Sequence, residues 1–217
     1  MVGVYPQLRL DFYETAVLMS RWMADGRVVT HPIAVADLVG ACSQVHLRSG
    51  LLPPDVLFWR QRGDQTLLGV YVAAQRWRVQ VEMTSGVALT DNAALTAGHI
   101  PLPPLLFVGQ GTAYHIFAVR RRPLDEWEPL YAAPCPNVHG DGAICQGNTP
   151  FPVCTAESIH LALRLFLEGS AFNGHLSQGK SVSEGEDVRR LWAKLDGRRR
   201  FPVGELVAMG RHLRDLL

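Results

Sequence analysis

Residues 76–83 read "RWRVQVEM", and apolar and polar side chains alternate strictly along this stretch. The apolar positions are Trp77, Val79, Val81 and Met83. Because successive side chains of a strand point to opposite faces, the alternation predicts a β-strand with one buried face. A sheet that covers a core on one side is therefore the centre of the expected fold.

Neighbouring segments predict more strands, joined by turns. The stretches "VLFWRQ" (56–61) and "TLLGVYV" (66–72) flank the turn "RGDQ", and "LLFV" (105–108) and "YHIFAV" (114–119) flank "GQGT". Each pair predicts a β-hairpin. Residues 84–100 are mostly small and polar, which predicts a loop. Together the segments indicate an antiparallel meander of three or four strands.

Helical spacing of apolar residues predicts three helices after the strands. The first is capped by Thr155 and ends at Gly169, the second covers residues 188–195, and the third covers residues 206–217. Strands and helices are segregated along the chain, and this order indicates an α+β fold. We assign residues 51–217 to this core.

The first fifty residues predict a separate extension. Residues 5–22 and "RVVTH" (27–31), joined by the turn "ADG", predict a β-hairpin. Residues 35–45 predict a helix that stops by Gly50, with Cys42 on its apolar stripe. We therefore expect an N-terminal hairpin and helix over residues 1–50.

Composition excludes several classes of protein. The chain has 217 residues, 47% of them apolar, which is enough to bury a substantial core. Its formal net charge of +1 argues against a nucleic-acid or membrane-surface partner. No apolar run approaches the length of a membrane span, and the N-terminus lacks the layout of a signal peptide. We therefore expect a cytoplasmic protein with four reduced cysteines.

Residues 123–154 form the least regular part of the chain. They contain six prolines and no sustained period, and loops of this length in compact domains are often functional. Within them, residues 134–148 read "PCPNVHGDGAICQGN" and include two of the four cysteines. This loop is therefore the first place where reactive groups are expected.

Cys145 is the candidate nucleophile of the loop. Gly142 and Gly147 lie close on either side, so the backbone there can approach a substrate and adopt positive φ angles. A thiol in such a loop is expected to be accessible, and its thiolate is the reactive form. The side-chain amide of Asn137 is a neutral donor that can stabilise the oxyanion formed when an acyl group is attacked.

Other interpretations of these cysteines remain open on residue pattern alone. Cys135, Cys145 and Cys154 could hold zinc together with His139 or His160, although no Cys-x₂-Cys pair occurs. Cys145 could also be a buried inert residue or the nucleophile of a Cys-His protease, although the local protease signatures are missing. We favour an acyl-transfer nucleophile with no metal.

The loop resembles a known signature. The stretch "CPN" at 135–137, followed by seven residues and the cysteine that ends "AIC", resembles the ubiquitin-conjugating enzyme signature H-P-N, seven residues, Cys. The run "VHGDGAIC" is similar to the same family's sequence before its catalytic cysteine. The surrounding order of strand meander, proline-rich flap "RPLDEWEPLYAAP", loop and helix also resembles that family.

A bacterial branch of the superfamily, the PRTRC system protein B group, is similar over a wider region. The shared string is "PLPPLLF…RP…PLY.AP.PNV…G.IC.GN..FP". The detailed similarity covers roughly residues 99–180, and the order of elements extends it to about 51–217. The resemblance implies a UBC-like antiparallel meander flanked by helices.

The resemblance implies a thioester mechanism. Cys145 would accept the C-terminal acyl group of a ubiquitin-like protein from a ThiF-like activating enzyme and pass it to an acceptor. Asn137 would stabilise the oxyanion and order the loop. Pro136 would set the turn before it, and Gly142 and Ile144 would shape the loop.

The sequence departs from the family pattern at three places. Cys135 stands where the family has histidine, and Gln146-Gly147 stands where it has Leu-Asp. The acidic residue that prepares an incoming lysine has no clear match. In its region lies "GSAFNGHL" (169–176), and His175 is our candidate for a base or an orienting group.

The implied partners are a ubiquitin-like protein, the ThiF-like activating enzyme and a JAB-type peptidase of the same cassette. The chain itself needs no cofactor, because the activating enzyme uses the ATP. Two other functions stay open: a non-catalytic binding module of the same fold and an accessory protein of plasmid maintenance. The presence of Cys145 and Asn137 favours the enzyme.

Overall fold

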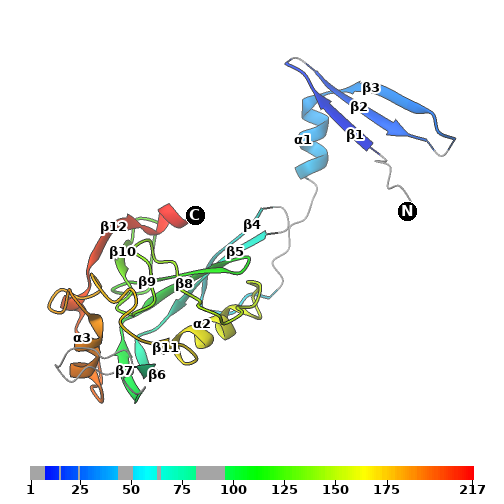
Figure 1. Cartoon of the computed structure of the whole chain (residues 1–217). Helices are drawn as coiled ribbons and strands as arrows, with labels where there is room; N and C mark the ends of the chain where they lie inside the picture. The colour runs from blue at the N-terminus through cyan, green and yellow to red at the C-terminus, as the bar shows by residue number, and fades with distance from the viewer. Residues whose placement is uncertain (1–7, 15, 24, 44–50, 63–64, 82–95) are drawn as a thin grey trace. The chain divides into compact units, whose positions relative to one another are not determined.

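A computed structural model describes residues 8–14, 16–23, 25–43, 51–62, 65–81 and 96–217. The chain divides into two compact units, Met1–Gly50 and Leu51–Leu217, and each is described by itself (Figure 1).

The N-terminal unit is a three-stranded antiparallel sheet followed by a helix. Its strands are β1 (Leu8–Phe12), β2 (Val17–Trp22) and β3 (Val28–Ile33), in that order, and its helix is α1 (Val35–Ser43). The expected single strand over residues 5–22 is wrong, because a turn closed by the Tyr13 N–H and the Ala16 carbonyl (2.8 Å) divides it. The side chain of Cys42 lies outside the described residues.

Few side chains are buried within this unit. Val17 and Ser20 are the buried residues among those described there, and Ser20 shares a 2.8 Å hydrogen bond with Thr30. On α1, Val35 and Val39 are exposed. The apolar face predicted for this helix is therefore not covered by the described part of its own unit.

The larger unit is built on a six-stranded antiparallel sheet. Its order is β12 (Ala208–His212), β10 (Pro129–Ala132), β9 (Ala113–Ala118), β8 (Leu105–Gln110), β5 (Gln65–Val72), β4 (Val56–Arg62). Both predicted hairpins are confirmed, since β4 pairs with β5 and β8 pairs with β9.

A second sheet contains the alternating stretch. Its order is β11 (Ala171–Phe172), β6 (Gln75–Val81), β7 (Thr96–Leu102), with β11 parallel to β6. The prediction for β6 is confirmed, because Trp77, Val79 and Val81 are buried, while Met83 lies outside the described residues.

Two expectations about this region are wrong. The loop predicted over residues 84–100 is wrong for residues 96–100, because these belong to β7, which pairs with β6 over seven residues and buries Ile100 and Leu102. The meander is also not continuous, because β6 and β7 leave the main sheet and β5 pairs directly with β8. Pairing with a neighbouring strand outweighs the weak intrinsic β-propensity of "TAGHIPL".

Two of the three predicted C-terminal helices form. Helix α2 (Ile159–Leu167) buries the predicted apolar face: Ile159, Ala162, Leu163, Phe166 and Leu167. Its N-cap is Ser158 and not Thr155, whose hydroxyl bonds to that of Ser158 at 3.2 Å. Helix α3 (Val188–Leu195) is capped by Asp187, whose side chain accepts a hydrogen bond from the Arg189 backbone N–H.

The third predicted helix is wrong. Residues 203–217 form two short 3₁₀ turns, η1 (Val203–Glu205) and η2 (Leu213–Leu216), on either side of strand β12. Strand β12 pairs with β10 and contains Gly210 at φ +67°. A β-sheet edge thus supplies the hydrogen bonds that a helix would have made internally.

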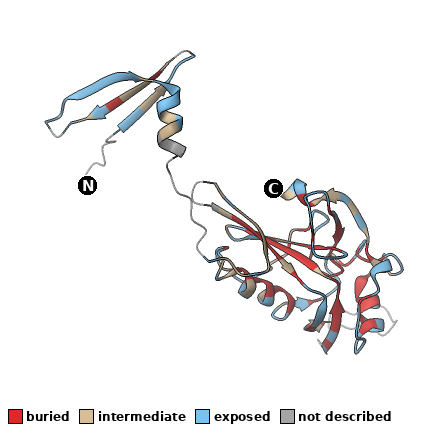
Figure 2. Ribbon diagram, turned by 180° about the vertical axis from the view of Figure 1, so that it is seen from behind, coloured by how far each residue is buried: buried red, intermediate tan, exposed pale blue. Residues whose placement is uncertain are grey.

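The core lies on both faces of the main sheet, and Figure 2 shows buried residues along its strands. The larger cluster joins alternate residues of β5, β8 and β9 to α2 and α3, with Leu68, Phe107, Phe166 and Trp192 at most 2% exposed. A smaller cluster on the other face includes Leu106, Phe117 and Leu213. Among the described residues, no helix is long and apolar enough to span a membrane.

Candidate functional site

The loop quoted above folds back on itself beside β9. Val138 and Ile144 form an antiparallel bridge, and His115 and Ala143 form another. The Ile144 N–H donates to the Tyr114 carbonyl at 3.0 Å. The loop is therefore an ordered continuation of the sheet edge where β10 stops.

Asn137 and Cys145 face each other across this fold. The Cys145 N–H donates to the Asn137 carbonyl at 2.7 Å, and the Asn137 N–H donates to the His175 carbonyl at 2.9 Å. Asn137 has φ +58°, a conformation that asparagine adopts more readily than most residues. Its side-chain Nδ2 donates to the Ala171 carbonyl at 3.2 Å, which ties the loop to the segment after α2.

A cavity of about 410 Å³ opens over this contact. All three predicted catalytic residues, Cys145, Asn137 and His175, line it. The structure thus brings together groups that are up to 38 residues apart in the chain, the separation of Asn137 and His175.

Most of the other residues that line this cavity are not predicted from the sequence. The additional polar side chains are those of Gln146, Asn148, Thr149, Ser170 and Asn173. Gln146 is fixed by a 2.6 Å bond from its Nε2 to the Thr112 carbonyl. The lining is therefore polar, and the described residues that form it include no Asp, Glu, Lys or Arg. The cluster of Ser, Asn and Gly residues after α2 is the sequence feature that could have indicated this polar lining.

Cys145 differs from the other described cysteines in exposure. It is a half-buried free thiol, whereas Cys135 and Cys154 are free thiols that are buried. Burial raises the pKa of Cys135 to about 12 and that of Cys154 to about 11. Cys154 is a packing residue of the core, since it lies against Tyr114 and the backbone of Gly109.

The three loop residues assigned to shaping the site all lie in ordered positions. Pro136 is buried directly before Asn137. Gly142 has φ +94°, and an added Cβ would lie 2.3 Å from the ring of Phe117. Ile144 is 7% exposed and belongs to the larger core cluster.

The structure does not gather the residues considered for zinc. His160 forms an ion pair with Asp55 at 3.4 Å, and His139 is exposed. Within the described ranges, no group of three or more His, Cys, Asp or Glu side chains is placed to hold a metal ion.

A family model described as prokaryotic E2 family D matches residues 34–209. The chain belongs to this family. The match covers α1 as well as most of the larger unit, so the family's sequence pattern crosses the boundary between the two units. No curated protein and no solved structure matches the chain.

Membership of prokaryotic E2 family D indicates a ubiquitin-conjugating-like role of the transferase type. In general terms, such a role requires interaction with a ubiquitin-like protein and with an activating enzyme.

The cysteines of this protein should differ in their rates of alkylation. We expect iodoacetamide at pH 8 to modify Cys145 faster than Cys135 or Cys154, because only the thiolate reacts. With a pKa of about 11, the Cys154 thiol is ionised in roughly one molecule in a thousand at that pH, and burial slows access further. Peptide mass spectrometry over time measures each rate, with Cys42→Ser as a background that removes the fourth thiol. Faster modification of Cys154 than Cys145 would contradict the assignment.

Proposed function

We propose that this member of prokaryotic E2 family D carries a ubiquitin-like protein as a thioester on Cys145. It would accept the acyl group from a ThiF-type activating enzyme and transfer it to an acceptor. The observation that carries the proposal is the half-buried Cys145 thiol in a cavity shared with Asn137 and His175. The finer assignment to a UBC arrangement, with the meander before the loop and α2 after it, is part of the same proposal.

The first step is a transthioesterification. The Cys145 thiolate attacks the carbonyl carbon of the activating enzyme's thioester, and the new C–S bond forms as the carbonyl oxygen takes up negative charge. Collapse of this intermediate breaks the old C–S bond and releases the activating enzyme's cysteine as a thiolate. In the second step an acceptor nucleophile attacks the Cys145 thioester and releases Cys145 in the same way. The proton of the acceptor goes to a base.

Asn137 would both hold the loop in place and stabilise the oxyanion. One of its two Nδ2 hydrogens is used by the Ala171 carbonyl, so one donor remains for an oxyanion. Its backbone holds Cys145 on one side and His175 on the other. Donors placed in advance for a developing oxyanion contribute about 10²- to 10³-fold in rate in other enzymes.

His175 is the proposed base or orienting group. Its side chain is exposed in the cavity, and its backbone N–H donates to Asn173 Oδ1 at 2.9 Å. Among the described residues that line the cavity, none carries a carboxylate, so the His175 imidazole is the group proposed to take a proton from the acceptor.

Cys135 would have a structural role in place of the family's histidine. It is fully buried, and its N–H donates to the Ala133 carbonyl at 2.7 Å. The neighbouring Pro134 carbonyl accepts a 2.7 Å hydrogen bond from the indole of Trp192. Packing against α3 thus supports the loop without a histidine hydrogen bond.

A charging assay tests the proposal. The purified protein is mixed with ATP and with the activating enzyme and ubiquitin-like protein encoded beside it, and products are resolved on a non-reducing gel. We expect an adduct that added thiol removes, that is absent in Cys145→Ala and that persists in Cys154→Ala. Cys145→Ser should trap the adduct as an ester stable to thiol. The JAB-type peptidase of the cassette would then be a candidate for removing the cargo from acceptors.

The assay also identifies the alternative. If the activating enzyme charges itself but no adduct forms on this protein, the thioester proposal is wrong. Binding of the ubiquitin-like protein without charging would then indicate a non-catalytic module.

A further inference from the structure

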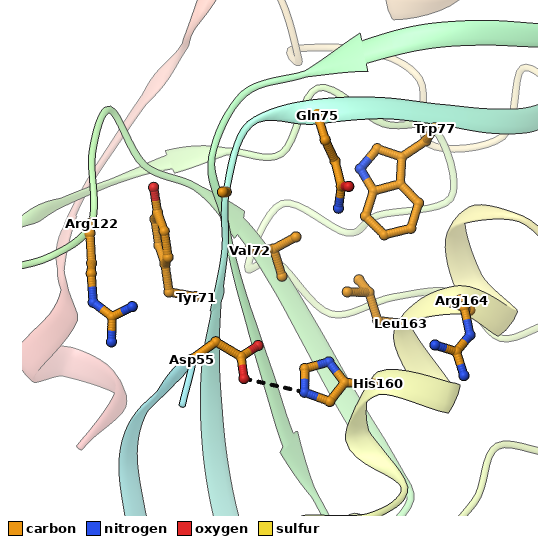
Figure 3. Close-up of a pocket in the computed structure, with 10 residues that line it drawn as sticks. Asp55, Tyr71, Val72, Gln75, Trp77, Arg122, His160, Leu163 and Arg164 are labelled. Carbon is orange, nitrogen blue, oxygen red and sulfur yellow. Dashed lines mark ion pairs between the residues drawn. The ribbon is translucent and has the colours of Figure 1, made fainter. Parts of the chain in front are cut away.

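A second cavity lies away from Cys145 and shares none of its lining residues. It has a volume of about 470 Å³, within the range of small-molecule sites. It lies between the end of β5, the start of β6 and one side of α2 (Figure 3). Nothing in the thioester proposal uses it.

The base of this cavity is apolar. Val72, Trp77 and Leu163 line it, and each is at most 8% exposed. Tyr71 adds an aromatic wall, with the Arg122 guanidinium 5.5 Å from its ring centroid. A flat or branched apolar group would therefore bury its surface here.

The Trp77 indole has an unmet hydrogen-bonding need. Its Nε1 is buried and has no acceptor among the residues that the structure describes. A buried donor left unpaired costs about 1–3 kcal/mol, so native structures rarely retain one without a reason. Figure 3 shows the ring nitrogen on the edge that faces Gln75, an exposed side chain at the mouth of the cavity.

Cationic groups surround the opening. Arg122 and Arg164 lie on opposite sides of it in Figure 3. The Arg164 side chain forms no ion pair or hydrogen bond within the described ranges, and Arg122 reaches the Pro54 carbonyl only at 3.4 Å. Asp55 is the carboxylate among the described lining residues, and it pairs with His160 at 3.4 Å. The opening therefore carries a surplus of positive charge.

From these observations we infer that the cavity binds a small organic anion with an apolar body. Its carboxylate or phosphate group would pair with Arg164, and its body would lie on Val72, Leu163 and Trp77. Gln75 would turn aside so that an acceptor atom of the ligand reaches the Trp77 N–H. The inference concerns binding alone and does not depend on chemistry at Cys145.

Nuclear magnetic resonance of the ¹⁵N-labelled full chain tests this inference. The Trp77 indole N–H resonance is assigned by its loss in Trp77→Phe. Indole-3-acetate and phenyl phosphate are the carboxylate and phosphate probes, and indole-3-acetamide is the neutral control. We expect at least one acid to shift the Trp77 resonance saturably, and the amide to bind about tenfold more weakly or worse, because it lacks charge-assisted bonds.

Two variants test whether Arg164 is the cationic group that binds the acid. Arg164→Gln should weaken binding of the acid about tenfold, whereas Arg78→Gln, an exposed arginine on the other face of β6, should leave it unchanged. Three results would each overturn the inference: no shift with either acid up to about 10 mM, equal affinity for acid and amide, or equal affinity in the Arg164→Gln variant.

Discussion

Replacing Gly142 by alanine should destabilise the larger unit by about 2–5 kcal/mol. Gly142 has φ +94°, where an L-residue is strained by about 1–2 kcal/mol. The new Cβ would also lie 2.3 Å from the Phe117 ring. That ring is completely buried in the smaller core cluster, so it cannot move aside without disturbing its neighbours, at a further cost of about 1–3 kcal/mol.

Gly147 provides a matched control for this substitution. It also has a positive φ, +55°, but an added Cβ would meet nothing within 4 Å. Gly147→Ala should therefore lose only the backbone contribution of about 1–2 kcal/mol. Urea denaturation followed by circular dichroism measures both. Equal losses would show that the Phe117 contact does not matter, and no loss in either would contradict the loop geometry.

Removing the Asp187 carboxylate should cost the larger unit about 3–5 kcal/mol. Asp187 caps α3 and binds the guanidinium of Arg189 at 2.8 Å, and Arg189 is 0% exposed. In Asp187→Ala, the buried arginine would lose this carboxylate, and α3 would lose its N-cap. Glu186→Ala is the control, because its ion pair with Arg190 is exposed and should contribute about 0–1 kcal/mol.

The same carboxylate predicts a dependence of stability on pH. Burial by itself raises the pKa of Asp187, but hydrogen bonds from the Arg189 side chain and backbone outweigh it and hold the pKa below its ordinary value of 3.8. A carboxyl with a lowered folded-state pKa stabilises the fold above its unfolded-state pKa and loses that contribution as pH falls through the folded value. We therefore expect the difference in unfolding free energy between the native chain and Asp187→Asn to shrink below about pH 4. A difference that grows toward acid would contradict the sign.

The local spacing of apolar residues correctly predicts β6 and α2, whose buried side chains recur at a regular period. The alternation around Trp77 and Val79 predicted β6, and the 3.6-residue spacing of Ile159 to Leu167 predicted the buried face of α2. In both segments the apolar side chains alone decide which face turns inward. Asn137 and Cys145 are also close enough in sequence for the pattern to predict them in one loop.

Two strands, β12 and β7, depend on tertiary contacts that the local spacing does not contain. The segment at Ala208–His212 has helix-compatible spacing, yet it forms β12, because the free edge of β10 offers backbone partners. Strand β7 exists because β6 pairs with it over seven residues. Such hydrogen bonds join residues distant in sequence, and no window of local sequence records them.

The candidate site shows the same division. The residue pattern alone predicts that Cys145 lies in a glycine-flanked loop with Asn137, since these residues are close along the chain and the glycines permit the turn. The packing of the fold brings His175 to this pair, because the Asn137 N–H donates to the His175 carbonyl, and it buries Cys135 while Cys145 stays half-buried. Local pattern does not contain these outcomes, because solvent exposure and the meeting of distant segments depend on how the sheets and helices pack, and a thiol's ionisation depends in turn on that exposure.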